Sequence, residues 1–359
     1  MQRVTLPEEI TVSNEWNRGS VRLVTLLSAT MALGMLACTS EETLTEPSAG
    51  TSPAEAVAAT YTAVDLGALP GGNLSSARAI NSAGQVAGVS GTAAGDNHAV
   101  LWKNGDITDL GTLGGSSSEA FGINNAGQVV GKSETAEGEF HAFLWEKGVM
   151  TDLGTPGGTS SAAIDINARG QILLGGSDGS VGVWERGIIT SLALPAGSSG
   201  CTPTGINAAG RVVGQCGVGQ SIHSELWDRA AVTDLGTLGG SVTAATAISA
   251  SGRVIGISRE QPDEGSRPFL WERGTMTNLS TQGAPNGFIP NAINAAGQIV
   301  GINATGGQLH ATLWHHGATV DLGALPGEDT YAFDINAAGQ VVGQTVGGNG
   351  TRATLWTRK

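Results

Sequence analysis

The stretch "DLGTLGGSSSEAFGINNAGQVVGKSETAEGEFHAFLW" runs from Asp109 to Trp145, and similar stretches recur along much of the chain. An Ile-Asn-like turn, such as "INNAGQV" from Ile123, precedes each closing tryptophan. These tryptophans recur every 39 to 44 residues, at Trp102, Trp145, Trp184, Trp227, Trp271, Trp314 and Trp356. The sequence therefore contains seven copies of one repeat, and a period of this length indicates a solenoid or a propeller.

Each copy has the pattern of four short β-strands. In the second copy they are "SEAFGIN", "GQVVGKS", "HAFLWE" and "GVMTDLG", which are short runs with β-branched or aromatic residues. An Asn-x-x-Gly turn joins the first pair, because Asn can hydrogen-bond its own backbone and Gly can take a positive φ. Lys147-Gly148 makes a tight turn in the second pair. Four strands in roughly 43 residues is typical of a propeller blade.

The two ends of the repeat region favour a closed ring. The last copy has only a few residues after Trp356, so it lacks the strand that follows the tryptophan in the other copies. "YTAVDLG", from Tyr61 to Gly67, precedes the first copy and can supply that strand. Such pairing leaves no exposed sheet edge, whereas an open solenoid needs polar caps. The sequence predicts an all-β, seven-bladed β-propeller closed by an N-terminal strand, with a β-solenoid as the alternative.

The joint motif resembles a known bacterial family. "HAFLW" from His141, together with Asp-Leu-Gly-x-Leu-Gly-Gly and Ile-Asn-x-x-Gly-Gln-Val, is similar to the HAF-type probable extracellular repeat proteins, over Tyr61 to Trp356. The resemblance implies secretion and a repeat fold, and it brings no established activity or catalytic residue. Most copies depart from the His-Ala-Phe tripeptide, as in "HAVLW" (His98), "SVGVW" (Ser180), "HSELW" (His223), "RPFLW" (Arg267), "HATLW" (His310) and "RATLW" (Arg352).

The N-terminal segment has the pattern of a secretory signal. "LVTLLSATMALGMLAC", from Leu23 to Cys38, is apolar, is preceded by Arg18 and Arg22, and is too short to span a bilayer comfortably. Its end, "MLAC", resembles the bacterial lipobox, which predicts that Cys38 carries the lipid of a bacterial lipoprotein. The alternative is a general secretory signal that is cleaved nearby, with Cys38 incidental.

These patterns divide the chain into three parts. Residues 1–38 form a leader with a lipoprotein-type signal, and because residues 1–20 are acidic, translation is expected to start near Val21. Residues 39–60 are rich in Ser, Thr, Glu, Pro and Ala without apolar periodicity, which is typical of a flexible tether. Residues 61–359 form the repeat domain. We expect an extracytoplasmic protein, on the cell envelope or secreted, that meets the membrane only through its anchor.

The overall charge argues against nucleic acid as a partner. The chain has 18 basic and 31 acidic residues, for a net charge of −13. Nucleic-acid binding requires clustered Lys and Arg, and no such cluster is visible along the sequence. We expect a monomer that binds no nucleic acid.

The repeated histidines and aspartates favour structural roles over catalysis or metal binding. His98, His141, His223 and His310 share one repeat position, which a ring would spread out rather than converge on a metal. We expect them to brace neighbouring strands or blades, and His315 and His316 to lie in an exposed turn. Asp-Leu-Gly opens five units, at Asp65, Asp109, Asp152, Asp234 and Asp321, with Ser191 and Asn278 in the other two. Each Asp is expected to accept backbone N–H bonds rather than to bind calcium. The sequence identifies no catalytic residue, cofactor site or metal site.

The fourth copy contains two cysteines of its own. Cys201 and Cys216 lie six residues outside the turn Asn207–Gly210, on either side of it. A symmetric turn would place them opposite each other, whereas a glycine bulge would shift the register and turn them to opposite faces. An oxidising compartment favours a disulfide between them. The sequence leaves this pairing open.

The links between the second and third strands vary most among the copies. They include "SGTAAGDN" (Ser90), "SETAEGEF" (Ser133), "SDG" (Ser177) and "SREQPDEGS" (Ser258). Alternating strand direction puts them on the same face of the ring as the "DLGTLGG" crossings, so this face is the expected binding site. The favoured function is non-catalytic binding of a glycan, peptide or protein. The alternatives are an enzyme acting on an extracellular polymer such as a carbohydrate, and a cell-envelope scaffold.

Overall fold

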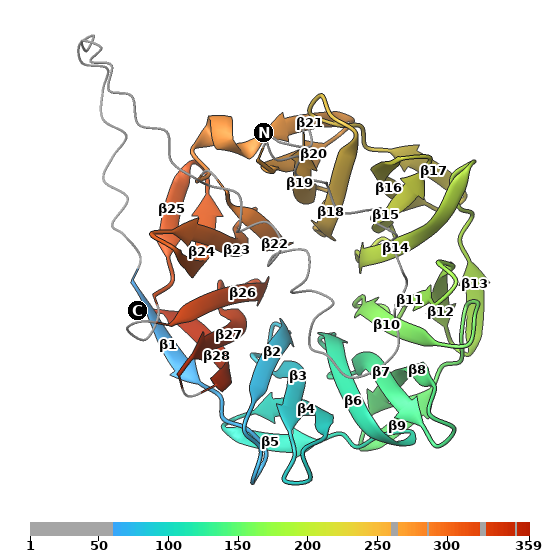
Figure 1. Cartoon of the computed structure of the whole chain (residues 1–359), viewed down its shortest axis with the longest axis vertical. Coiled ribbons are helices and arrows are strands. Elements are labelled where there is room, and N and C mark those ends of the chain that lie inside the picture. Colours follow the sequence, from blue (N-terminus) through green and yellow to red (C-terminus); the bar gives the residue numbers. More distant parts are fainter. Residues whose placement is uncertain (1–59, 260–264, 286, 324–327, 349) are drawn as a thin grey trace, which may run out of the picture. The chain divides into compact units, whose positions relative to one another are not determined.

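The computed structural model describes residues 60–259, 265–285, 287–323, 328–348 and 350–359. Within these residues the strands group into seven units of four antiparallel strands that surround a common centre (Figure 1). A single parallel bridge between Ile222 and Val242 joins the fourth and fifth units into one eight-stranded sheet. The described residues contain no helix that is long and apolar enough to cross a membrane. The predicted leader, Cys38 and the predicted tether to Ala59 lie outside the described residues.

The strands of each unit run from the innermost position outwards. Unit 1 has β2 (Ser75–Ile80), β3 (Val86–Gly91), β4 (Asn97–Lys103) and β5 (Asp106–Asp109). Unit 2 has β6 (Gly114–Ile123), β7 (Val129–Thr135), β8 (Phe140–Glu146) and β9 (Val149–Asp152). Unit 3 has β10 (Ser161–Ile166), β11 (Ile172–Gly176), β12 (Val181–Glu185) and β13 (Ile188–Ser191). Unit 4 has β14 (Ser198–Ile206), β15 (Val212–Val218), β16 (Ser221–Asp228) and β17 (Ala231–Asp234).

The remaining units follow the same order. Unit 5 has β18 (Val242–Ile248), β19 (Val254–Arg259), β20 (Arg267–Glu272) and β21 (Thr275–Asn278), after which η1 (Leu279–Gln282) makes a turn of 3₁₀-helix. Unit 6 has β22 (Ile289–Ile293), β23 (Ile299–Thr305), β24 (Gln308–His315) and β25 (Ala318–Asp321). Unit 7 has β26 (Asp329–Ile335), β27 (Val341–Gly347) and β28 (Gly350–Arg358), with β1 (Tyr61–Asp65) as its outermost strand.

Strand β1 closes the ring as the sequence predicts. It pairs antiparallel with β28, so that Tyr61 lies opposite Arg358 and Asp65 opposite Thr354. The first and last segments of the repeat region therefore share one sheet (Figure 1). This closure confirms the β-propeller and excludes the open β-solenoid.

Every innermost strand contains a β-bulge close to its end. In β6, for example, the register against β7 shifts between Ala120 and Gly122, which leaves Phe121 as the extra residue. The bulge brings the inner backbone close to the next strand, and a Cβ built on Gly131 would lie 1.9 Å from the Glu119 carbonyl oxygen. Glycine in the "QVVG" segment is therefore required by the close approach of two backbones.

The asparagine of each Ile-Asn turn shapes that turn. Asn81 Oδ1 accepts hydrogen bonds from the backbone N–H groups of Ala83 and Gln85, each at 3.0 Å. Its Nδ2 donates to Gln85 Oε1 at 2.8 Å, and Gly84 takes a φ of 76°. The turn is thus an Asx-type turn whose sequence signature is the asparagine and the glycine.

The same asparagines also link each unit to the next around the ring. Asn81 Nδ2 donates to the Asn124 carbonyl oxygen at 3.0 Å, and Asn336 Nδ2 donates to the Asn81 carbonyl oxygen at 3.1 Å across the point of closure. The other links of this kind run from Asn124 to Asn167, Asn167 to Asn207, Asn207 to Ser249 and Asn294 to Asn336. We call these bonds the asparagine ring. It lacks one link, because Ser249 has no amide to donate towards Asn294.

Hydroxyl groups add a second set of bonds between units. Ser118 Oγ accepts from the Ala99 N–H of the preceding unit at 2.8 Å and donates to the Gly111 carbonyl oxygen at 2.6 Å. Ser75, Ser161, Thr243 and Thr330 accept in the same way at the equivalent position. The innermost strand of one unit is therefore bonded to the third strand of its neighbour.

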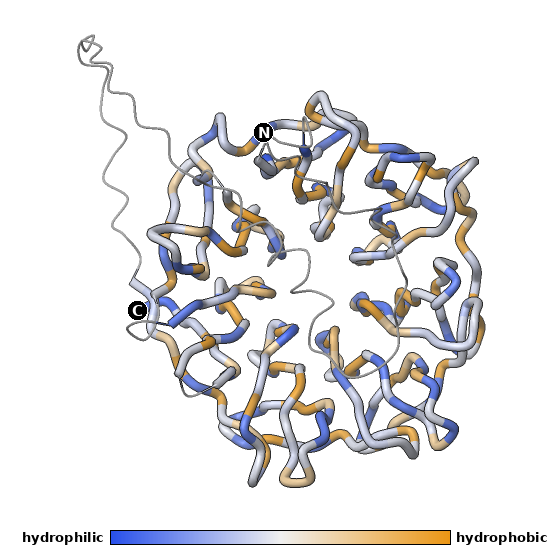
Figure 2. Tube along the Cα trace, viewed as in Figure 1, coloured by the Kyte–Doolittle hydropathy of each residue, from blue (hydrophilic) through white to orange (hydrophobic). Residues whose placement is uncertain are grey.

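The hydrophobic core is divided among the interfaces between neighbouring units. One cluster joins Ala99 and Leu101 of unit 1 to Ala120 and Phe143 of unit 2. Figure 2 shows apolar segments within every unit rather than at one central mass. Trp102, Trp227 and Trp356 each donate from Nε1 to a carbonyl oxygen of the crossing into their own unit, as in the bond from Trp227 to Ala193 at 2.8 Å.

Completing the asparagine ring should stabilise the fold. Ser249→Asn places an amide next to Arg253, as Asn207 already lies next to Arg211, and should raise the free energy of unfolding by about 0.5–1.5 kcal/mol. Asn336→Ser removes the closing link and should lower it by about 1–3 kcal/mol. Urea denaturation of both variants and the wild type measures these changes. A Ser249→Asn variant no more stable than the wild type would contradict the role assigned to the ring.

Candidate functional site

The turns and the loops of the propeller lie on opposite faces. We call the face with the Ile-Asn turns and the hairpins between third and fourth strands the turn face. The other face, with the crossings between units and the links between second and third strands, is the loop face. The first serine of four links accepts a hydrogen bond from a crossing, which confirms that links and crossings share a face. These bonds join Leu69 N to Ser90 Oγ, Leu113 N to Ser133 Oγ, Ser160 N to Ser177 Oγ and Leu238 N to Ser258 Oγ.

The repeated histidines pair with the repeated aspartates at the loop face. The distances between Nδ1 and Oδ2 are 2.8 Å for His98–Asp109, 2.8 Å for His141–Asp152, 2.6 Å for His223–Asp234 and 2.9 Å for His310–Asp321. Each aspartate also accepts the N–H of the glycine two residues later. The histidines therefore brace third and fourth strands, and the aspartates cap the crossings, as expected from their repeat positions.

The pairing of the repeated histidine with the repeated aspartate was not predicted from the sequence. The signal is present, because the two positions are always 11 residues apart where both occur. In two of the other units both positions change, since Ser180 accompanies Ser191 and Arg267 accompanies Asn278. In unit 7 only the histidine position changes, to Arg352, and Asp65 remains. In the part of the chain that the structure describes, no group of three or more His, Cys, Asp or Glu side chains is arranged to hold a metal ion.

The two cysteines of unit 4 lie directly opposite each other and form a disulfide. The turn is asymmetric by one residue, since Ile206 pairs with Val212. The bulge between Pro203 and Gly205 shifts the register once more and brings Cys201 opposite Cys216. The sequence left open whether the two cysteines lie opposite each other or on opposite faces, because the turn alone does not decide this. The bulge decides it. Cys38 lies outside the described residues.

A buried carboxyl group lies beside one of the histidine–aspartate pairs. Glu225 is 3% exposed and lies across from Asp234 in the sheet. Burial raises its pKa to about 7, Asp234 adds to the rise, and His223 opposes it. The equivalent positions in units 1 and 2 are Val100 and Phe143. Unit 4 therefore contains an acidic group with a pKa suited to proton transfer near neutral pH.

Charged and aromatic side chains form a cluster on the innermost strands of units 7, 1 and 2 and on the neighbouring strands β7 and β8 of unit 2. The Arg78 guanidinium lies 4.9 Å from the centre of the Phe333 ring. Lys132 Nζ lies 3.9 Å from Glu119 Oε1 and 5.0 Å from the centre of the Phe140 ring. Burial lowers the pKa of Arg78, and Glu119 opposes this change. Arg78 Nε has no hydrogen-bond partner among the described residues. We call these five residues the inner-strand cluster.

Two half-buried aspartates in the innermost strands β10 and β26 have a structural role. Asp165 accepts the N–H of Ile206 at 3.0 Å, and Asp334 accepts that of Ile80 at 2.9 Å, in each case from the following unit. Burial raises the pKa of Asp165 to about 6, while these backbone bonds lower it. These carboxyl groups join adjacent units.

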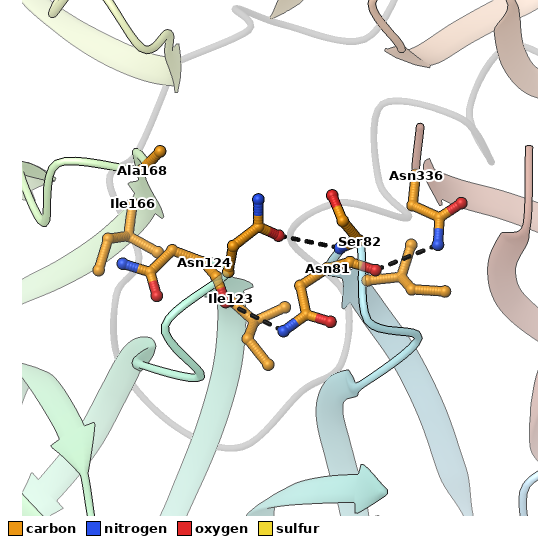
Figure 3. Close-up of a pocket in the computed structure, with 9 residues that line it drawn as sticks. Asn81, Ser82, Ile123, Asn124, Ile166, Ala168 and Asn336 are labelled. Carbon is orange, nitrogen blue, oxygen red and sulfur yellow. Dashed lines mark hydrogen bonds between the residues drawn. The ribbon is translucent and has the colours of Figure 1, made fainter. Parts of the chain in front are cut away.

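A hollow of 190 Å³ lies at the turn face, inside the asparagine ring (Figure 3). Its lining is uncharged and comes from three consecutive Ile-Asn turns and from Asn336. The lining residues are Ile80, Asn81, Ser82, Ile123, Asn124, Asn125, Ile166, Ala168 and Asn336. The amides of Asn81 and Asn336 are used in the ring, and Asn125 Oδ1 accepts the Ser82 N–H at 2.9 Å (Figure 3). Ser82 and Asn125 are the exposed polar residues at this site.

The pH dependence of stability should report the state of Glu225. Its folded pKa of about 7 lies above the ordinary value of 4.5, so the unfolded chain releases this proton more readily. The free energy of unfolding of the wild type should therefore fall by about 2–3 kcal/mol, relative to that of Glu225→Gln, as the pH rises from about 4.5 to about 7. Urea denaturation at pH 5 and pH 8 measures this difference. Equal effects of the substitution at both pH values would contradict it.

A scan against protein-family models and a search of curated protein sequences found no match to the chain. Solved structures do match. The β-propeller domain of the Trilobed protease from Pyrococcus furiosus has a TM-score of 0.56 and 10% identity, over 80% of this chain and 97% of that one. The WD40 β-propeller domain of Doa1 has a TM-score of 0.50 and 14% identity, over 79% of this chain and 94% of that one. An acylaminoacyl peptidase from Pyrococcus horikoshii has a TM-score of 0.54 and 10% identity over 80% of this chain. This chain spans about half of that protein's length (52%). These likenesses show a β-propeller fold.

Proposed function

We propose that the chain is a non-catalytic, lipid-anchored, extracytoplasmic propeller that binds a glycan, peptide or protein partner through its loop face. The observation that carries this proposal is that the links between second and third strands have a fixed base and a variable tip. Their first serines are bonded to the crossings beneath them, whereas the residues that follow differ in length and chemistry from unit to unit. Variable loops on a rigid frame are suited to recognition.

The charge of the loop face narrows the chemistry of the partner. Acidic side chains greatly outnumber basic ones there. The acidic residues are Asp65, Asp96, Asp109, Glu134, Glu137, Glu139, Asp152, Asp178, Asp234, Asp321, Glu328 and Asp329. The basic residues are Lys132, Arg259, Arg267 and Arg352, and Arg352 is already paired with Glu328. Such a face favours neutral glycans or basic peptide segments over polyanions.

The inner-strand cluster supplies a second recognition element. Aromatic rings next to charged groups can contact the apolar face of a sugar or an arginine side chain. Glu119 and Lys132 lie opposite each other at the middle of β6 and β7, and Phe140 begins β8 at the loop face. The cluster thus extends the proposed binding surface towards the centre of the ring.

An enzyme acting on an extracellular polymer is the second candidate, and Glu225 favours it. A carboxyl group with a pKa of about 7 next to the His223–Asp234 pair could act as a general acid. Glu225→Gln separates the two hypotheses, because it would abolish turnover of a polymer substrate but leave a purely binding function unchanged.

The location of binding can be tested with variants on the two faces. A thermal-shift screen of the chain from Thr39 onwards, against glycans, peptidoglycan fragments and basic peptides, should find a saturable ligand. Glu137→Ala combined with Asp178→Ala, in two different links, should weaken that ligand about tenfold or more. The matched turn-face variant, Glu185→Ala with Glu272→Ala, should bind normally. A ligand lost only in the turn-face variant would overturn the assignment to the loop face.

Lipid attachment has its own test. Cys38→Ser should abolish incorporation of labelled fatty acid and release the protein from membranes, because no other residue would carry the anchor. Metabolic labelling followed by membrane fractionation measures both effects. Labelling that persists in the variant would refute the lipobox at Cys38.

A further inference from the structure

The turn face has the opposite charge balance to the loop face. Among the described residues, basic side chains outnumber acidic ones there by two to one. The basic residues are Lys103, Lys147, Arg169, Arg186, Arg211, Arg229, Arg253, Arg273, Arg358 and Lys359. The acidic residues are Asp106, Glu146, Glu185, Asp228 and Glu272. A chain with a net charge of −13 therefore presents one cationic face.

The cations at the rim of this face come from a single structural position. Hairpin turns between third and fourth strands place Lys147, Arg186, Arg229 and Arg273 at the rim, and all four are exposed. Asn104 and His316 occupy the same position in units 1 and 6. In the part of the chain that the structure describes, Arg186, Arg229 and Arg273 have no ion-pair or hydrogen-bond partner, whereas Lys147 lies 3.6 Å from Glu146. These three arginines are available to an external anion.

Local structure does not account for basic residues at this position. Every non-glycine residue with a positive φ in the described part of the chain lies in one of these hairpins, with φ from 48° to 58°. Side chains with a Cβ are disfavoured in this conformation, and Asn or Gly is the ordinary choice. Because the side chains are exposed, packing does not require Lys or Arg either. A sterically disfavoured residue with an exposed side chain points to a role for its charge.

The chain also enters the propeller on this face. Tyr61 begins β1 opposite Arg358, and the Thr60 carbonyl oxygen accepts from the Lys359 N–H at 2.9 Å. The segment predicted as a tether, and Cys38 before it, therefore connect to the propeller at the turn face. A lipid on Cys38 would attach the protein to its membrane from the cationic side.

We propose that the turn face docks on the anionic phospholipid surface of the membrane that carries the anchor. Basic side chains near such a surface are attracted by its negative potential, and this attraction would add to the attachment that the lipid on Cys38 provides. Docking of this face would direct the acidic loop face away from the membrane, towards the partner. The orientation rests on the proposed lipid anchor, whereas the affinity of the turn face for anionic lipid does not.

Vesicle binding by the chain from Thr39 onwards tests this affinity without the anchor. Every strand and every core cluster lies between Tyr61 and Arg358, so this chain contains the whole propeller. It should co-sediment with vesicles of phosphatidylglycerol and phosphatidylcholine, but not with phosphatidylcholine alone, and the binding should weaken with added salt. Arg186→Gln, Arg229→Gln and Arg273→Gln together should weaken binding at least tenfold. Asn104→Lys, which adds a cation at the equivalent position, should strengthen it.

A matched variant separates location from net charge. Ala93→Glu, Ala94→Glu and Ala136→Glu change the net charge equally but lie in exposed links of the loop face, and they should leave vesicle binding nearly unchanged. Equal loss in both triple variants, or no binding to anionic vesicles, would overturn the proposal. So would binding of a soluble polyanion such as dextran sulfate in the absence of vesicle binding. Unchanged melting temperatures ensure that all variants are folded. Failure here leaves ligand binding by the loop face and labelling of Cys38 intact, since those tests use other variants.

Discussion

The structure depends on a single side chain that makes both a local and a long-range bond. In most units the asparagine of the Ile-Asn turn accepts two N–H bonds from its own turn, and its amide reaches the backbone of the next unit. Because both bonds use one rigid amide group, the shape of the turn and the angle between neighbouring units are set together. A ring of repeats can close only if the angle between neighbouring units is nearly the same at every interface. The repeated Ile-Asn turn keeps this angle the same.

The two faces of the ring meet different structural demands. At the turn face the connections between strands are short and closely hydrogen-bonded, and their lengths vary little among the units. At the loop face the histidine–aspartate pairs and the link serines hold the base of each loop, while the loop tips vary. This division lets one repeat maintain the ring and still offer seven different surfaces. It also separates charge, with carboxylates gathered on one face and unpaired arginines on the other.

Sequence reasoning identified the site residues more readily than their partners. His141 and Asp152 were both identified from the repeat, yet only the sheet shows them in contact, because pairing of third and fourth strands brings together residues 11 apart. The opposition of Cys201 and Cys216 depends on a bulge at Thr204 that cancels the asymmetry of the turn. Glu225 drew no attention in the sequence, since its pKa comes from burial next to Asp234. The inner-strand cluster likewise joins residues of units distant in sequence, such as Arg78 and Phe333.

The amino-acid sequence alone predicts the repeat, its four strands, the Ile-Asn turns and the closing strand at Tyr61–Asp65. Each of these follows from periodicity or from residues with strong backbone preferences. The predicted lipid anchor also comes from the sequence alone. The tertiary structure decided what lies next to what across units. The basic residues of the turn face are dozens of residues apart in the chain, so no run of sequence reveals them as a group. They become one surface only because the ring brings every hairpin of one kind to the same face, and charges interact through space rather than along the chain.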